Sequence, residues 1–294
     1  MTLTGKARLA GIIGWPVTHS LSPVLHGHWL AEHGIDGAMV PLAAQREDFS
    51  AVIDGARRAG FKGVNVTVPH KEAAFAIAHK LDGPALAAGA ANLLVFHEDG
   101  IEGRNTDALG LADSLRESIG TLDGKTVILL GAGGAARGAI LSLEMLGASH
   151  IHLLNRDVQR AKTLAASLSK QVRGAVEPAG LSDWQKVAGG AALVVNSTSA
   201  GMGANPPLDL DLSQLAPSAA VCDIVYDPLE TKLLKDAARA PAARKARAPD
   251  HRSRARGAYC IRGQGAGREE SLDSVSRTEF LSHKQCNQQA QFPH

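Results

Sequence analysis

The sequence lacks the features of exported, disulfide-bonded or membrane-spanning proteins. Its 294 residues include only three cysteines, odd in number and far apart, which argues against both a disulfide framework and a zinc site. No apolar run approaches the ~20 residues that cross a bilayer. Residues 1–10 show no long apolar stretch followed by a cleavage site. We therefore expect a cytoplasmic protein without a bound metal or a membrane partner.

Charge is spread unevenly along the chain. The net charge of +2 combines −4 for residues 1–238 with +6 for residues 239–294. Only seven of these last 56 residues are large and apolar, so little offsets the entropy cost of ordering them. We expect 239–294 to be an atypical basic tail that is largely unstructured. Its nine arginines could attract phosphates, but no recognition module accompanies them, and nucleic acid is not an expected partner.

The preceding residues alternate short apolar runs with amphipathic stretches, a pattern typical of an α/β fold with mostly parallel strands. The expected strands are 9–13, 37–42, 63–68, 92–96, 126–130, 151–154, 192–195 and 221–225. The expected helices include 23–33, 49–59, 108–119, 135–146 and 158–168. The length predicts two domains, and we place them at 1–106 and 107–238.

A glycine-rich turn opens the second domain's first strand–helix unit. The apolar run Thr126–Leu130 is followed at once by Gly131, Ala132, Gly133, Gly134, Ala135 and Ala136, and then by a helical pattern. In this context the glycines allow a tight turn and the close approach of a pyrophosphate, while a small residue at 136 allows close helix packing. The pattern predicts a dinucleotide site; a plain strand-to-helix turn is the alternative.

The end of the next strand indicates which dinucleotide is bound. NAD sites usually place an acidic residue here, but this strand ends in Asn155 and Arg156, with Arg160 one turn later. Arginines suit the 2′-phosphate of NADP. Two alternatives stay open: the arginines could be a solvated helix start, and Asp157 could still support NAD.

Several polar clusters interrupt the apolar pattern of the first domain and of its boundary with the second. They are rich in hydroxyls and amides and comprise Ser20, Ser22, Asn65, Thr67, Asn92 and Asp107. Singly, each has an ordinary structural explanation as a helix cap or a strand-end polar group. Together they suit a small polyhydroxylated ligand.

Lys71 follows one of these clusters at the start of a helix. The positive end of the helix dipole opposes its charge, and a nearby Asp107 would favour it. A lysine held between these effects can exchange a proton near neutral pH. A solvated lysine is the alternative.

The motifs in order resemble the shikimate dehydrogenase family. The matching segments are 14–26, 65–71 (N-V-T-V-P-H-K), 89–92, 105–107 with Gly110, 131–136, 155–156, 196–198, and 226–228 with Thr231. The resemblance covers residues 9 to about 236. It implies an N-terminal α/β substrate domain and a Rossmann-like dinucleotide-binding domain around a cleft. It also implies the reversible NADP-linked reduction of 3-dehydroshikimate to shikimate, on the route to aromatic amino acids.

The resemblance also implies roles for individual residues. Lys71 and Asp107 would form the catalytic pair. Ser20, Ser22, Asn65, Thr67, Asn92, Asp107 and Tyr226 would surround the ligand. The glycine-rich turn, Asn155, Arg156, Arg160 and Thr198 would hold NADP. A homodimer, and the preference between shikimate and quinate, are left open.

Two departures from the family pattern leave alternatives. Leu93 stands where the family usually has threonine, and the closing D-G-x-x-M-L-x-x-Q run is missing after Asp236. The motif and the apolar pattern are lost together and abruptly, which predicts a shifted reading frame. A lineage-specific extension is the alternative. We expect such a chain to be less stable and less active. The alternative functions are a quinate/shikimate dehydrogenase using NAD and a silent binder of dinucleotide or shikimate.

Overall fold

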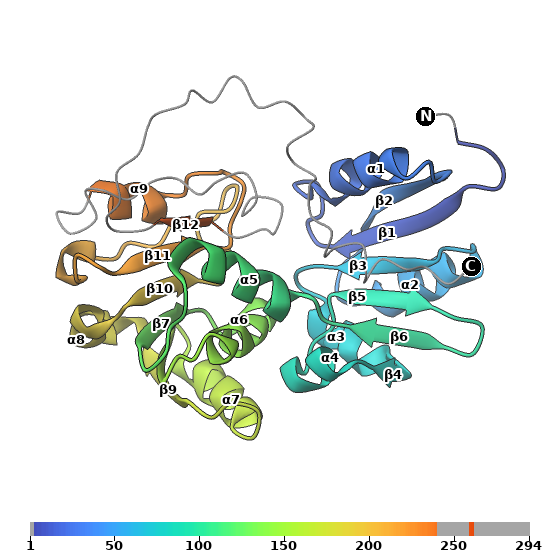
Figure 1. Ribbon diagram of the computed structural model, residues 1–294. Helices are drawn as coiled ribbons and strands as arrows, with labels where there is room; N and C mark the ends of the chain where they lie inside the picture. Colours follow the sequence, from blue (N-terminus) through green and yellow to red (C-terminus); the bar gives the residue numbers. More distant parts are fainter. Residues whose placement is uncertain (1–2, 240–258, 262–294) are drawn as a thin grey trace.

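The computed structural model describes residues 3–239 and 259–261, which form two α/β domains with one six-stranded sheet each (Figure 1). The order in the first sheet is β2-β1-β3-β5-β6-β4. Its strands are β1 (Arg8–Gly14), β2 (Gly37–Ala43), β3 (Gly63–Val66), β4 (Lys80–Leu81), β5 (Leu93–Phe96) and β6 (Ile101–Arg104). Its helices are α1 (Ser22–Glu32), α2 (Phe49–Arg58), α3 (Lys71–Ile77) and α4 (Gly83–Ala88).

The first sheet is mixed. β1 lies parallel to β2 and β3, whereas β5 is antiparallel to both β3 and β6. β5 and β6 are joined by a tight turn in which the His97 N–H donates to Gly100 O at 2.9 Å. Such a short connection cannot make the crossover that parallel strands require. Phe49 and Ile53 of α2 are buried against Val64 and Leu94, which form part of this domain's core.

The order in the second sheet is β12-β11-β10-β7-β8-β9, and all its pairs are parallel except β11 with β12. Its strands are β7 (Thr126–Leu130), β8 (His150–Asn155), β9 (Ala175–Gly180), β10 (Leu193–Asn196), β11 (Ala220–Asp223) and β12 (Tyr259–Ile261). Its helices are α5 (Asp107–Ile119), α6 (Gly134–Met145), α7 (Val158–Leu168), α8 (Trp184–Val187) and α9 (Lys232–Arg239). Three-residue 3₁₀ turns begin at Leu181, Ala188 and Leu212.

Helices cover both faces of the second sheet. One face is buried by apolar side chains of α5, α6 and α7, such as Leu115, Ile140 and Leu164. The opposite face is buried by α8 and α9, through Trp184 and Leu233 among others. Strands buried on both faces are expected to be continuously apolar. This explains why the Thr126–Leu130 segment could be recognised from its sequence.

Each expected strand and helix is present, with ends shifted by a few residues. Four strands in the described ranges were not predicted: β4, β6, β9 and β12. β6 carries Glu102 and Arg104, which pair at 2.9 Å. β9 lies at a sheet edge and contains Pro178, a residue that edge strands tolerate. Polar and proline-containing strands lack the apolar signal on which such predictions depend.

The expectations for the tail concern mostly residues outside those the structure describes. Within 240–294 the structure describes only β12, which lies beside β11 with Cys260 opposite Cys222. No helix in the described ranges is long and apolar enough to cross a membrane.

Candidate active site

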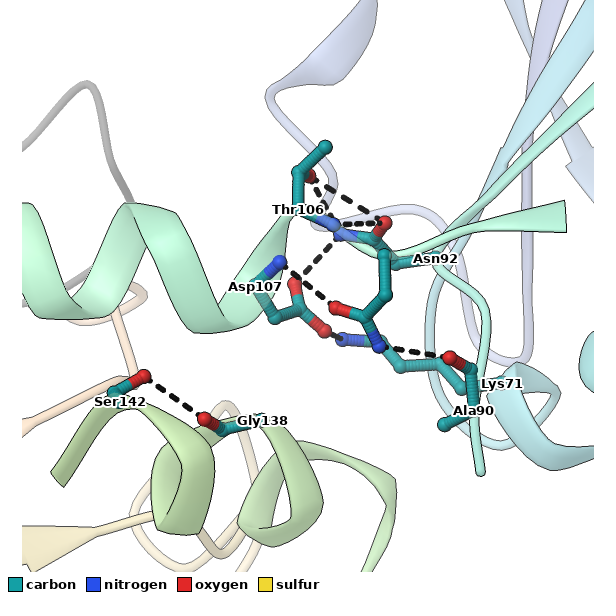
Figure 2. Close-up of polar contacts among 8 residues, drawn as sticks. Lys71, Ala90, Asn92, Thr106, Asp107, Gly138 and Ser142 are labelled. Atoms are coloured by element: carbon teal, nitrogen blue, oxygen red, sulfur yellow. Dashed lines mark hydrogen bonds and ion pairs between the residues drawn. The ribbon is translucent and has the colours of Figure 1, made fainter. Parts of the chain in front are cut away.

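Lys71 and Asp107 meet between the two domains (Figure 2). The Lys71 Nζ donates to Asp107 Oδ2 at 2.6 Å, and the two side chains are only 15% and 28% exposed. Lys71 is the first residue of α3 and Asp107 the first residue of α5. Partial burial strengthens a charge-assisted hydrogen bond of this kind. The predicted catalytic pair is therefore in direct contact.

Asn92 holds the other oxygen of the same carboxylate. Its Nδ2 donates to Asp107 Oδ1 at 2.7 Å and to Thr106 Oγ1 at 3.0 Å. Its Oδ1 accepts from the Thr106 backbone N–H at 3.0 Å. Because Asn92 and Lys71 each bind one oxygen of Asp107, the carboxylate is fixed in one orientation (Figure 2).

Asn105, which the sequence analysis did not name as a site residue, helps to position Asp107. Its side chain is buried, donates to Ala90 O at 2.8 Å and accepts from the Asp107 N–H at 2.9 Å. Ala91, which follows Ala90 in the chain, donates its N–H to Lys71 O at 2.9 Å. One backbone segment thus positions the starts of both α3 and α5. The available signal was the segment 105–107, which Asn105 begins and which belongs to the family resemblance.

The start of α6 packs directly on the catalytic pair. A Cβ added to Gly134 would meet Lys71 Cβ at 3.3 Å, and one added to Gly138 would meet Asp107 Cβ at 3.0 Å. Ser142, one turn further, donates to Ala108 O and to Gly138 O, both at 2.8 Å. Gly134 was predicted to serve the cofactor; its small size also leaves room for the Lys71 stem.

The other predicted ligand residues come from both domains. Tyr226, which follows β11, reaches across to the first domain and hydrogen-bonds the Leu21 backbone and the Ser20 side chain. Burial raises the pKa of Tyr226, and these two hydrogen bonds oppose the rise. Ser20 Oγ also accepts from the Ser22 N–H at 3.3 Å. Two of the expected ligand residues, Ser20 and Tyr226, are thereby brought together from opposite domains.

Asn65 and Thr67 lie at the end of β3, beside the end of β1. Asn65 Nδ2 lies 3.2 Å from His26 Nε2 of α1, and burial lowers the pKa of His26. The Thr67 N–H donates to Ile13 O at 2.9 Å, and its methyl group occupies the space beside Gly14. His26 belongs to the 14–26 motif but was not predicted as a site residue.

The glycine-rich turn has the shape of a phosphate cradle. Gly131 has a φ of 107°, and a Cβ there would collide with Thr198 at 2.8 Å, so only glycine fits. A Cβ on Gly133 would meet no described atom within 4 Å. The α6 helix that follows has no side-chain cap, which leaves its first N–H groups free for an anion. The residues present therefore fit a dinucleotide, and Thr198 borders the turn.

The end of β8, the next strand along the chain, is also suited to NADP. Asn155 Nδ2 donates to Asp157 O at 2.8 Å, and Arg156 and Arg160 are exposed. Neither guanidinium has a polar partner within the described ranges. Asp157 caps α7, and its Oδ1 accepts from the Gln159 and Arg160 N–H groups at 2.9 and 3.3 Å. That carboxylate is already engaged, which weakens the NAD alternative.

A buried carboxylate that the sequence analysis missed organises the ends of β10 and β11. Asp223 is fully buried and accepts from Asn196 Nδ2, the Val225 N–H and Thr231 Oγ1 at 2.9, 3.0 and 2.7 Å. Asn196 in turn accepts from Thr198 Oγ1 at 2.7 Å. The network therefore fixes the Thr198 loop beside Gly131. Its signal was a polar residue ending the apolar strand Ala220–Asp223.

Replacing Asp223 with alanine should cost stability. The change leaves buried donors of Asn196, Val225 and Thr231 without an acceptor, and each such group costs about 1–3 kcal/mol. We expect the free energy of unfolding to fall by about 2 kcal/mol or more. Denaturant unfolding followed by circular dichroism measures this. A loss no larger than that of the exposed control Asp209→Ala would contradict the role of the network.

Asp223→Asn should instead show a pH dependence. Burial raises the pKa of Asp223, with hydrogen bonds from Thr231, Val225 and Asn196 opposing the rise. The folded state therefore favours the protonated form, so this contribution to stability is present below the unfolded pKa of about 3.9 and is lost as the pH rises through the folded value. Asparagine cannot ionise, so the stability of Asp223→Asn relative to the parent should increase from about pH 4 to pH 7. A flat difference would contradict the raised pKa.

Arg137 of α6 is a further residue that the sequence analysis missed. Its Nη1 donates to Ala88 O at 3.1 Å in the first domain and to Ser167 Oγ at 3.2 Å in the second. Its Nε lies 3.4 Å from Glu72 Oε1. One side chain thus connects α6 with α3, α4 and α7 beside the catalytic pair.

The fold and the site together define a class: a two-domain α/β oxidoreductase with a dinucleotide cradle facing a lysine–carboxylate pair. Comparison with known families agrees. Residues 12–94 match the shikimate dehydrogenase substrate binding domain, and residues 113–203 match shikimate / quinate 5-dehydrogenase. The chain belongs to the shikimate dehydrogenase family.

Individual relatives support the same family assignment. The chain is 48% identical over 235 residues to shikimate dehydrogenase (NADP(+)) of Acidiphilium cryptum, covering 80% of this chain and 82% of that one. It is 33% identical to the Thermus thermophilus shikimate 5-dehydrogenase solved with NADP(H) and shikimate, with a TM-score of 0.68 and coverage of 79% and 84%. It is 30% identical to the quinate dehydrogenase of Corynebacterium glutamicum solved with NAD, with a TM-score of 0.71 and coverage of 81% and 85%.

Proposed function

We propose that the chain catalyses the reversible NADPH-dependent reduction of 3-dehydroshikimate to shikimate. The observation that carries this is the Lys71–Asp107 contact of 2.6 Å at the start of α6. A lysine held by a carboxylate is suited to give a proton to a carbonyl oxygen and to take it back in the reverse direction. The names of the relatives supply the substrate and the cofactor.

The residues around the pair would hold the substrate. Ser20 and Ser22 offer hydroxyl groups for its carboxylate, and Tyr226 closes the same region from the second domain. Asn65 and Thr67 line β3's end, and Asn92 and Asp107 offer polar groups to the ring hydroxyls. Groups fixed by hydrogen bonds before binding lose little entropy when the substrate arrives, which favours one reactive orientation.

The cofactor would lie along the glycine-rich turn. Gly131 to Ala136 would hold its pyrophosphate, with Asn155 and Thr198 on either side. Arg156 and Arg160 would bind the 2′-phosphate, since their guanidinium groups have no polar partner in the described ranges. When bound, NADPH supplies the hydride, and Lys71 supplies the proton. The Arg156–Arg160 pair and the engaged Asp157 favour NADP over NAD.

We also propose residues 1–106 as the substrate domain and 107–238 as the cofactor domain. The division is supported by α5, which begins at Asp107 and packs against the second sheet. Asp107 then lies at the junction of the two domains and belongs to both the substrate side and the cofactor side of the site.

The test is a spectrophotometric assay of the full chain. With 3-dehydroshikimate, the absorbance of NADPH should fall, and NADH should be a poorer substrate. A preference for NADH, or turnover of quinate above shikimate in the reverse direction, would favour the quinate dehydrogenase alternative. Calorimetric binding of NADPH and shikimate without any change in NADPH absorbance would favour the silent binder.

A further inference from the structure

Two histidines and a glutamate gather on the second sheet, away from the glycine-rich turn. His150 and His152 lie on β8, and Glu177 lies on β9. His150 Nε2 is 3.0 Å and His152 Nδ1 is 3.3 Å from the same oxygen, Glu177 Oε2. The three ligand atoms lie within 4.8 Å of one another.

The ladder between β8 and β9 places these side chains. Successive side chains of a strand point to opposite faces, so His150 and His152 share one face. His152 is paired with Glu177 and His150 with Ala175 in the parallel register, which brings Glu177 to the same face. The neighbouring Ile151 and Leu153 are fully buried and anchor the strand. The cluster therefore stands on regular backbone rather than on a loop.

The spacing matches tetrahedral coordination. Zinc lies about 2.0–2.1 Å from imidazole nitrogen and carboxylate oxygen, which separates neighbouring ligands by about 3.3 Å. The observed separations of 3.0 and 3.3 Å between each imidazole nitrogen and the carboxylate oxygen are close to this value. The two imidazole nitrogens also lie within 4.8 Å of each other.

The position of the cluster leaves a side open to solvent. β9 is the edge strand of the sheet, and the three side chains are 35%, 17% and 60% exposed. A metal ion could enter without any opening of the core, and water could fill the fourth position. His150 and His152 precede Asn155 by about 17 and 10 Å along the strand, so such an ion would not touch the cofactor turn.

We propose that His150, His152 and Glu177 bind one divalent transition-metal ion, with zinc as the principal candidate. Two imidazoles and a carboxylate are ligands that zinc accepts, and copper and nickel suit the same donors. The ion would join the edge strand β9 to β8 and so stabilise the sheet. A histidine pair two residues apart is a weak pattern, and the third ligand comes from another strand, so the sequence analysis did not identify this site.

The experiment is a zinc titration of the metal-free full chain in competition with a chromophoric chelator. The chain has 12 histidines and three cysteines, so the informative quantity is the change in stoichiometry. The His150→Gln/His152→Gln variant should bind one zinc ion fewer than the parent and should lose the visible absorption of tetrahedral Co²⁺. Zinc should also raise the melting temperature of the parent more than that of the variant.

The matched control is His97→Gln, which removes a histidine that pairs with Glu102 at 3.1 Å without a second imidazole. It should bind zinc as the parent does. Glu177→Gln, at a more exposed position, keeps the test valid if the double variant does not fold. It should lower the affinity of this site about tenfold or more. Unchanged stoichiometry and affinity in these variants, or an equal loss in His97→Gln, would overturn the proposal.

Discussion

Replacement of Lys71 by alanine is expected to lower kcat by about 10²–10⁴-fold, the range contributed by a general acid–base group. The change removes the ammonium that Asp107 and the start of α6 position. The binding of shikimate should weaken much less, because Asn92 still holds Asp107 and the hydroxyl-bearing residues are untouched. Steady-state kinetics with NADPH, together with calorimetric binding of shikimate, measures both effects.

The control for this prediction is Lys80→Ala. Lys80 is an exposed lysine on β4 of the same domain and lies outside the catalytic pair. It should keep turnover close to that of the parent. If Lys71→Ala also stayed within a few-fold of the parent, proton transfer by Lys71 would be wrong. A large loss of shikimate affinity with unchanged kcat would assign Lys71 to binding instead.

Replacement of Arg156 by alanine is expected to raise the KM for NADP by about 10–100-fold, while the KM for NAD changes little. A hydrogen bond to a charged group contributes about 1.5–3 kcal/mol, which corresponds to that range. Only NADP carries the 2′-phosphate that the guanidinium would bind. Measuring KM for both cofactors with shikimate in excess gives the ratio directly.

Lys162→Ala is the matched control, because Lys162 is another exposed cation on α7. It separates a specific contact from general attraction of a negatively charged cofactor, and it should leave the NADP-to-NAD ratio unchanged. Equal effects of Arg156→Ala on both cofactors would show that Arg156 does not contact the 2′-phosphate. A double variant with Arg160→Ala should lose still more affinity for NADP if both arginines share the phosphate.

Much of the second domain could be predicted because its signals are local. The run Thr126–Leu130 forms the buried β7, and Gly131 takes the positive φ that its place in the motif required. The expectation for Arg156 likewise followed from its place at a strand end. The edge strand β9 could not be predicted in this way, because polar residues and Pro178 remove the apolar signal.

The sequence by itself determined the alternation of strands and helices, the glycine-rich turn and the residue types proposed for the ligand site. Apolar periodicity, glycine conformation and helix starts act over a few residues, so they are visible in the chain. Only the tertiary structure decided which of these residues meet. Lys71 reaches Asp107, and Tyr226 reaches Ser20, because the two domains lie side by side (Figure 1).

The same physical reason explains the residues that the sequence analysis missed. Asp223 is an ordinary strand-end residue until three donors from distant positions surround it. Glu177 becomes a neighbour of His152 only through the register of β9 against β8. Contacts between distant segments depend on packing and strand register, which no short stretch of sequence specifies.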